Sequence, residues 1–118
     1  MNNTWMTSDW LEPQGATRVA RHVVDFSLAV VSKTAPLPVQ GRAENISVEG
    51  MAAMLTAELG SANIVTLSFV LPMVHEAVQV RAFVRYRDGY RYGFEFMGLS
   101  DDDRDAIDRM CERLPVAV

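Results

Sequence analysis

A group of residues in the first half of the chain has the chemistry to bind a small anion or the edge of a purine. Asn45 carries both donor and acceptor groups, and the hydroxyl of Ser47 can rotate to suit its partner. Gly50 permits a positive φ angle or the close approach of a ligand. Upstream, Arg18 and Arg21 offer planar guanidinium groups, which can pair with two acceptor atoms at once. These residue types indicate recognition of a ligand.

Catalytic and metal-binding motifs are not recognisable in the sequence. There is no nucleophile elbow, no phosphate-cradling glycine loop and no motif of paired carboxylates. His22 and His75 have no cysteine or carboxylate at a metal-like spacing, and the acidic run 101–105 lacks the spacing of a calcium loop. We therefore expect a binding module and not an enzyme, with no catalytic residue, no metal and no cofactor.

Most of the chain shows the two-residue period of half-buried β-strands. Val24, Phe26, Leu28 and Val30 alternate with polar or small residues, and the same pattern recurs further along. The pair Asp88-Gly89 is a hairpin signal between the last two strands. The expected strands run from about 21 to 30, 39 to 46, 51 to 59, 65 to 71, 78 to 86 and 90 to 96.

The fifth of these strands places three arginines on one face. Arg81, Arg85 and Arg87 alternate with Val80, Val84 and Tyr86, so the arginines are expected to point away from the core. A solvated outer face is one interpretation of this arginine face, and a contact surface for an anion is the other.

The period changes to that of an amphipathic helix after Leu99. Ser100 is expected as the N-cap, because Asp103 follows three residues later and further aspartates favour the positive end of the helix dipole. Ile107, Met110, Cys111 and Leu114 share one apolar stripe, where Cys111 is expected to be a buried small hydrophobe, and Pro115 ends the helix. Six short strands and one closing helix predict a mainly β protein: an antiparallel barrel or strongly curled sheet.

Length and composition predict one soluble domain. The chain has 118 residues, with 49% hydrophobic and 22% charged residues, which is ordinary for a globular protein. A net charge of -4 argues against non-specific binding to DNA or RNA. No apolar stretch is long enough to enter a membrane, and the lone cysteine suits a reducing compartment, so we expect a cytoplasmic protein. Residues 1–17 are interpreted as a flexible lead-in and residues 18–118 as the domain.

With these motifs in place, the sequence resembles the PilZ family of bacterial domains between about Thr17 and Leu114. Asn45, Ser47 and Gly50 match every specified position of the family motif [DN]xSxxG, and Arg21 matches the second arginine of its motif RxxxR. The resemblance implies a six-stranded antiparallel barrel with a C-terminal helix. It also implies binding of cyclic di-GMP by Arg18, Arg21, Asn45, Ser47 and Gly50, with ordering of the N-terminal segment and a changed surface for a protein partner.

One position departs from the family pattern. Thr17 stands where the first arginine of RxxxR belongs, and Arg18 lies one residue later, giving RxxR. Two functions therefore stay open. The first is a cyclic di-GMP receptor, and the alternative is a degenerate PilZ-like module that works by protein contact alone. The sequence does not identify that protein partner, the ligand stoichiometry or the oligomeric state.

Overall fold

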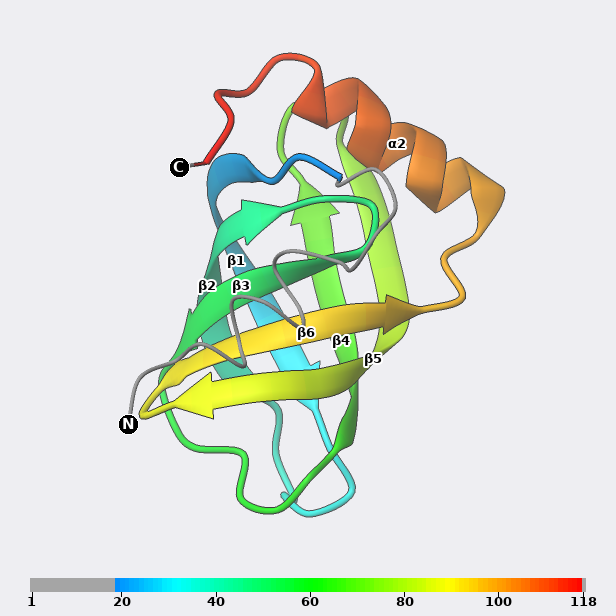
Figure 1. The fold of residues 1–118 in the computed structure, drawn as a ribbon. Helices are drawn as coiled ribbons and strands as arrows, with labels where there is room; N and C mark the ends of the chain where they lie inside the picture. The colour runs from blue at the N-terminus through cyan, green and yellow to red at the C-terminus, as the bar shows by residue number, and fades with distance from the viewer. Residues whose placement is uncertain (1–18, 118) are drawn as a thin grey trace.

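A closed six-stranded barrel with one C-terminal helix is the fold of residues 19–117, which are the residues described by this computed structural model (Figure 1). Every neighbouring pair of strands is antiparallel, and the order around the barrel is β1-β2-β3-β6-β5-β4. The predicted fold class is confirmed. The elements are β1 (His22–Val31), β2 (Val39–Ile46), β3 (Gly50–Leu55), β4 (Ile64–Leu71), β5 (Glu76–Asp88), β6 (Arg91–Met97) and α2 (Asp101–Cys111).

The alternating residues of each strand fill the barrel. In β4, for example, Val65, Leu67, Phe69 and Leu71 are buried, while the residues between them are more exposed. Ring contacts join the strands inside, with the centroids of Phe26 and Phe69 5.5 Å apart. The pairing of β1 with β4 closes the barrel.

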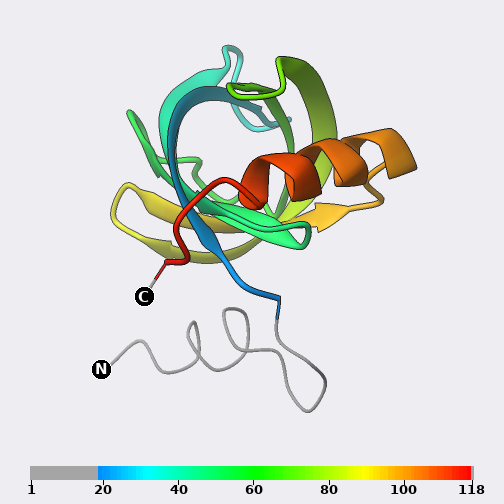
Figure 2. The ribbon, with the colours of Figure 1, turned by 90° about the horizontal axis from the view of Figure 1, so that it is seen from above.

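Helix α2 lies across one end of the barrel (Figure 2). Its predicted N-cap is confirmed, because the Ser100 hydroxyl accepts a hydrogen bond from the Asp103 N–H at 3.1 Å. Ile107, Met110 and Cys111 face the barrel and are buried, as the apolar stripe predicts. The helix ends at Cys111, short of the predicted Leu114, which packs on the core from the segment that follows.

Some strand ends differ slightly from the predictions. β3 ends at Leu55 and not at Leu59, because the chain turns there; Leu59 is buried, and its N–H donates to the Tyr92 hydroxyl at 2.9 Å. The hairpin between β5 and β6 is present, but Asp88 pairs with Arg91. The turn residues are therefore Gly89, with a φ of 62°, and Tyr90.

The predicted arrangement of β5 fails beyond Val84. The register with β6 shifts between Val84, which pairs with Phe94, and Tyr86, which pairs with Gly93. This bulge inserts one residue, so Tyr86 changes to the outer face of the barrel. Arg87 then donates to the carbonyl oxygens of Gly60 and Ala62 and does not share an exposed arginine face.

Candidate functional site

Arg21 and Asn45, which are far apart in the sequence, meet on the outside of the barrel. Arg21 directly precedes β1, and Asn45 lies near the end of β2, where it pairs with Val23. The Arg21 Nε–H donates to Asn45 Oδ1 at 2.7 Å. The antiparallel pairing of β1 with β2 therefore places the arginine segment against the Asn45–Gly50 motif.

Ser47 has a structural role in the turn that joins β2 to β3. It is almost fully buried, its hydroxyl accepts the Glu49 N–H at 3.0 Å, and its own N–H donates to the Gly50 carbonyl at 2.9 Å. Ser47 thus shapes the turn.

Gly50 is the first residue of β3 and is buried opposite Glu95 of β6. Of the two roles that the sequence allows Gly50, the positive φ is not used, because the glycines with positive φ in the described part of the chain are Gly60, Gly89 and Gly98. Next to it, the Glu49 carbonyl accepts the Phe96 N–H at 2.8 Å, which ties the turn to β6. The turn is therefore fixed by its own hydrogen bonds and by the bond from β6.

Burial gives Arg21 an unusual electrostatic setting. Desolvation lowers the pKa of its guanidinium from 12.5 to about 10, against the opposing influence of Tyr86, Glu49 and Cys111. The group stays protonated at neutral pH. A positive charge in this partly dehydrated setting interacts more strongly with an anion than a charge in bulk water would.

A row of small and aromatic residues continues outward from Asn45, and sequence reasoning missed it. Asn45 pairs with Ala52, Ala52 with Gly93, and Gly93 with Tyr86, so the row crosses β2, β3, β6 and β5. Ala52 and Tyr86 are only 2% and 7% exposed, yet neither belongs to the hydrophobic cluster inside the barrel. The available signal was Gly93 between Tyr92 and Phe94, since a glycine in a strand often marks a close approach.

The Tyr86 ring occupies the space over Gly93. A Cβ atom at position 93 would lie 2.5 Å from Cδ2 of that ring, so only glycine fits beneath it. Desolvation raises the pKa of the Tyr86 phenol, while the Arg91 and Arg21 charges act in the opposite direction. The phenol is therefore neutral at physiological pH and adds a flat, uncharged surface beside Arg21.

Ion pairs surround this row on neighbouring strands. The Arg91 Nε–H lies 3.0 Å from Glu44 Oε1, and the Arg42 Nε–H lies 2.7 Å from Asp25 Oδ1. The hydrogen bond to Glu44 raises the pKa of Arg91. These exposed pairs neutralise arginines that would otherwise add positive charge to the face.

The remaining predicted site residue, Arg18, and the substituted position Thr17 lie outside the described residues. The structure therefore brings together Arg21, Asn45, Ser47 and Gly50, through the Arg21–Asn45 bond and the turn that follows Asn45.

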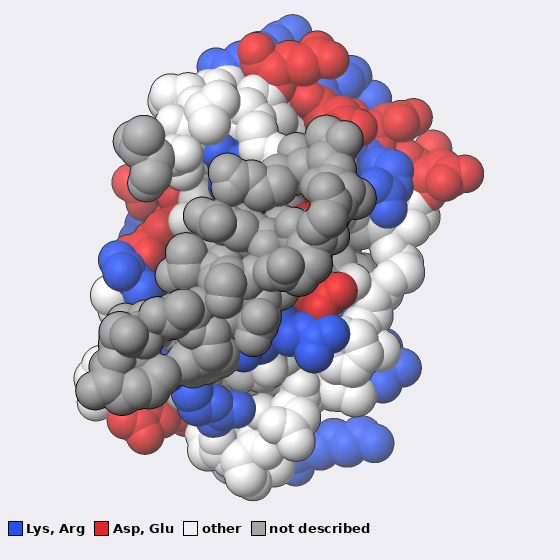
Figure 3. Space-filling model, in the orientation of Figure 1, with Lys and Arg blue, Asp and Glu red and all other residues white. Residues whose placement is uncertain are grey.

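Other surface features have a different character. Acidic side chains gather over α2 at the top of the molecule (Figure 3). Within residues 19–117 no three histidine, cysteine or acidic side chains come close enough to hold a metal ion. No helix in this part of the chain is long and apolar enough to cross a membrane.

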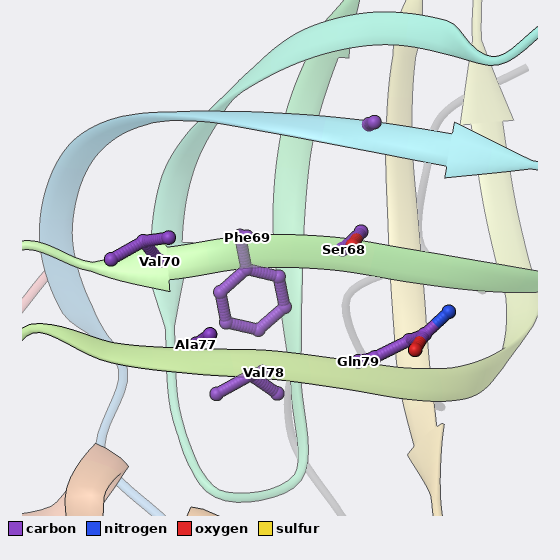
Figure 4. Close-up of a pocket in the computed structure, with 7 residues that line it drawn as sticks. Ser68, Phe69, Val70, Ala77, Val78 and Gln79 are labelled. Carbon is purple, nitrogen blue, oxygen red and sulfur yellow. The ribbon is translucent and has the colours of Figure 1, made fainter.

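A depression lies over β1, β4 and β5, away from Arg21. Figure 4 shows Ser68 and Val70 on β4 beside Ala77 and Gln79 on β5, with Phe69 and Val78 between them. Ala29 of β1 completes its lining, which contains no charged side chain. This depression therefore offers no positive charge to a phosphate.

Comparison with known proteins agrees with the barrel. The PilZ domain of CeSA from a cellulose-synthesizing bacterium has a TM-score of 0.59 at 19% identity, covering 79% of this chain and 95% of that one. The PilZ domain of YcgR from Escherichia coli, solved with c-di-GMP, has a TM-score of 0.67 at 15% identity, covering 85% of this chain and 92% of that one. The Bacillus subtilis inhibitor of motility, MotI (DgrA), has a TM-score of 0.69 at 18% identity, covering 84% of this chain and 50% of that one.

These structural likenesses establish the fold alone, because the identities are low. No curated protein sequence matches the chain. The family model of the PilZ domain, however, matches residues 16–113, which is most of the chain. This protein therefore belongs to the PilZ domain family.

Proposed function

We propose that this PilZ domain is a receptor for cyclic di-GMP, with Arg21, Asn45, Ser47 and Gly50 forming the barrel side of the site and Arg18 completing it. The observation that carries the proposal is the 2.7 Å bond from Arg21 to Asn45, which joins the two family motifs into one surface. The c-di-GMP present in the YcgR domain supports the choice of ligand, since that domain shares the fold.

The chemistry of the site fits such a ligand. The planar guanidinium of Arg21 can pair with guanine O6 and N7 or with a phosphate. The guanidinium is partly dehydrated, so a bound anion would stabilise its charged form. Asn45 adds an amide donor to this surface, and the buried Ser47 shapes the turn beside it. Binding needs no bond to be made or broken, so the domain acts as a binding module and not as an enzyme. Ligand binding would order the N-terminal segment and change the surface offered to a protein partner.

Titration calorimetry with cyclic di-GMP tests the proposal directly. We expect a dissociation constant in the micromolar range or tighter for the wild type, and loss of measurable binding in Arg21→Ala. Arg81→Ala is the matched control, because Arg81 is an exposed arginine on β5, three strands from Asn45. Cyclic di-AMP controls for the guanine edge. A wild-type protein that gives no heat at high micromolar cyclic di-GMP would refute the proposal.

The second candidate function is a PilZ-like module that has lost the nucleotide and acts through protein contact alone. Thr17 favours it, because a threonine cannot supply the bidentate contacts of the first arginine of RxxxR. A folded protein that ignores cyclic di-GMP and binds one defined protein partner would select this second function.

A further inference from the structure

The segment after α2 pairs with the start of β1, next to the arginine of the proposed site. The Val23 N–H donates to the Pro115 carbonyl at 2.9 Å, and the Ala117 N–H donates to the Arg21 carbonyl at 2.7 Å. These bonds enclose an antiparallel bridge between His22 and Val116. We name this pairing of residues 114–117 with residues 21–23 the C-terminal clasp; Figure 1 shows the red C-terminal segment beside the blue start of β1.

The His22 side chain adds a third bond to the clasp. Its Nδ1 lies 3.1 Å from the Leu114 carbonyl. A carbonyl oxygen only accepts, so Nδ1 must carry the proton that is shared. The clasp is thus held at three consecutive residues of the arginine segment.

The other side of the clasp is fixed by helix α2. Leu114 packs against the core, and the Cys111 thiol contacts the Ile46 carbonyl at 3.9 Å. Ile46 lies between Asn45 and Ser47. Helix α2 therefore contacts the Asn45–Gly50 motif at Ile46, and the clasp contacts the chain at Arg21 and Val23.

Arg21 needs such support because it lies outside the barrel ladder. The pairing of β1 with β2 begins at His22, opposite Ile46, so the β1–β2 ladder does not fix the backbone of Arg21. Its carbonyl is held by Ala117 instead. A segment at the far end of the sequence thus holds the backbone of the residue whose side chain reaches Asn45.

We propose that the C-terminal clasp positions Arg21 for ligand binding, and that Ala117 is the key positioning residue. The ligand half of this inference rests on the proposed function; the positioning of Arg21 over Asn45 does not. Because coupling between two events is reciprocal, a nucleotide bound by Arg21 stabilises the clasp, and loss of the clasp weakens the binding of the nucleotide.

A pair of proline variants separates the clasp bond from general effects on the segment. Ala117→Pro removes the N–H that donates to the Arg21 carbonyl. Val116→Pro is the matched control, since it adds a proline at the neighbouring residue, whose N–H is not one of the two clasp donors. Melting temperatures verify that both variants are folded.

The first readout is independent of any ligand. The exchange of the Arg21 Nε–H with water, followed by nitrogen-resolved NMR, reports on its bond to Asn45. We expect exchange about fivefold faster in Ala117→Pro, which corresponds to the loss of one ordinary hydrogen bond, and no change in Val116→Pro. Equal exchange in the wild type and Ala117→Pro would overturn the positioning role.

The second readout is calorimetry with cyclic di-GMP. We expect Ala117→Pro to weaken binding by about fivefold and Val116→Pro to leave it within about twofold. Faster Nε–H exchange with unchanged affinity would overturn the coupling to the ligand. If the wild type itself does not bind, the proposed function fails, and the exchange measurement still decides whether the clasp positions Arg21.

Discussion

The Arg21 guanidinium is destabilised by its surroundings in the free protein. Its pKa falls from 12.5 to about 10 because burial removes water from the charge. At about 1.4 kcal/mol per pKa unit, this fall corresponds to a destabilisation on the order of 3 kcal/mol in the free domain. The bond to Asn45 offsets part of it. Such a charge is well suited to a ligand site, because a bound anion would restore what desolvation removed.

Arg21→Met should therefore make the free protein more stable while removing its ligand site. Methionine preserves the length of the side chain and removes the charge, at the expense of the hydrogen bond to Asn45, which is worth about 1 kcal/mol, and of the other contacts that Arg21 makes. We expect a net gain of about 1 kcal/mol or more, seen as a melting temperature raised by roughly 4–8 °C. Arg81→Met is the control and should change little, because Arg81 is exposed. A lower melting temperature in Arg21→Met would show that Arg21 stabilises the fold.

The position of the missing arginine gives the second prediction. Thr17 occupies the place of the first arginine of the family motif. If the barrel side of the site is intact, Thr17→Arg should raise affinity for cyclic di-GMP by about tenfold or more, or about 1.4 kcal/mol, the low end of one bidentate guanine contact. Calorimetry measures the gain, and the melting temperature of the free protein should stay the same because Thr17 precedes the first strand.

Arg18→Ala in the wild-type background provides the matching control. A large loss of affinity would show that the RxxR spacing already works, and Thr17→Arg would then add little. Unchanged affinity in both variants would leave the arginine side of the site unsupported and would contradict the prediction.

At the scale of single elements, local patterns predicted most of the structure. The two-residue period located β1, β4, β5 and β6, the flanking prolines and Gly50 separated β2 and β3, and Ser100 located the start of α2. The bulge between Val84 and Tyr86 was not predictable in this way, because one inserted residue leaves the composition of the strand unchanged while it reverses the faces that follow. The row from Asn45 to Tyr86 was missed for the same reason.

The close contact between β5 and β6 at this bulge can be tested by a double-mutant cycle. Gly93→Ala places a Cβ against the Tyr86 ring and should destabilise the domain by about 1–3 kcal/mol through overpacking. In a Tyr86→Ala background the ring is gone, so the same substitution should have a much smaller effect. Urea unfolding measures all four proteins, and equal effects of Gly93→Ala in the two backgrounds would contradict the contact.

At the scale of the whole molecule, the contacts that define the site join distant parts of the chain. Arg21 meets Asn45 across β1 and β2, and Ala117 holds Arg21 from the other end of the sequence. The proximity of Arg21 to the Asn45–Gly50 motif was foreseeable, because each has a local sequence context, and their role in binding stays a prediction. The clasp was not, because no local period encodes the pairing of the two ends. The fold also places Cys111 of α2 against Ile46, the residue that follows Asn45.

Cys111 makes the stability of the whole domain sensitive to alkaline pH. Burial raises the pKa of its thiol from 9.0 to about 11, an effect that Asp108 strengthens and Arg21 opposes. Below pH 9 the thiol is protonated in the folded and unfolded states, so its contribution to stability is fully present. Between pH 9 and pH 11 the unfolded chain releases the proton while the folded protein retains it, so the free energy of unfolding falls as the pH rises.

Comparison of the wild type with Cys111→Ala between pH 8 and pH 10.5 isolates this effect. The variant loses buried volume at every pH, but it has no thiol to ionise. The stability difference between the two proteins should therefore shrink by about 1–2 kcal/mol across this range, measured by urea unfolding under reducing conditions. Tyr86, whose pKa is also raised by burial, and Arg21 titrate in both proteins, so they largely cancel in the difference. Cys111→Ser should behave like the alanine variant, because serine does not ionise in this range. If the two stability curves stayed parallel, the thiol would have the same pKa in the folded and unfolded chains, and Cys111 would not be buried between α2 and the barrel.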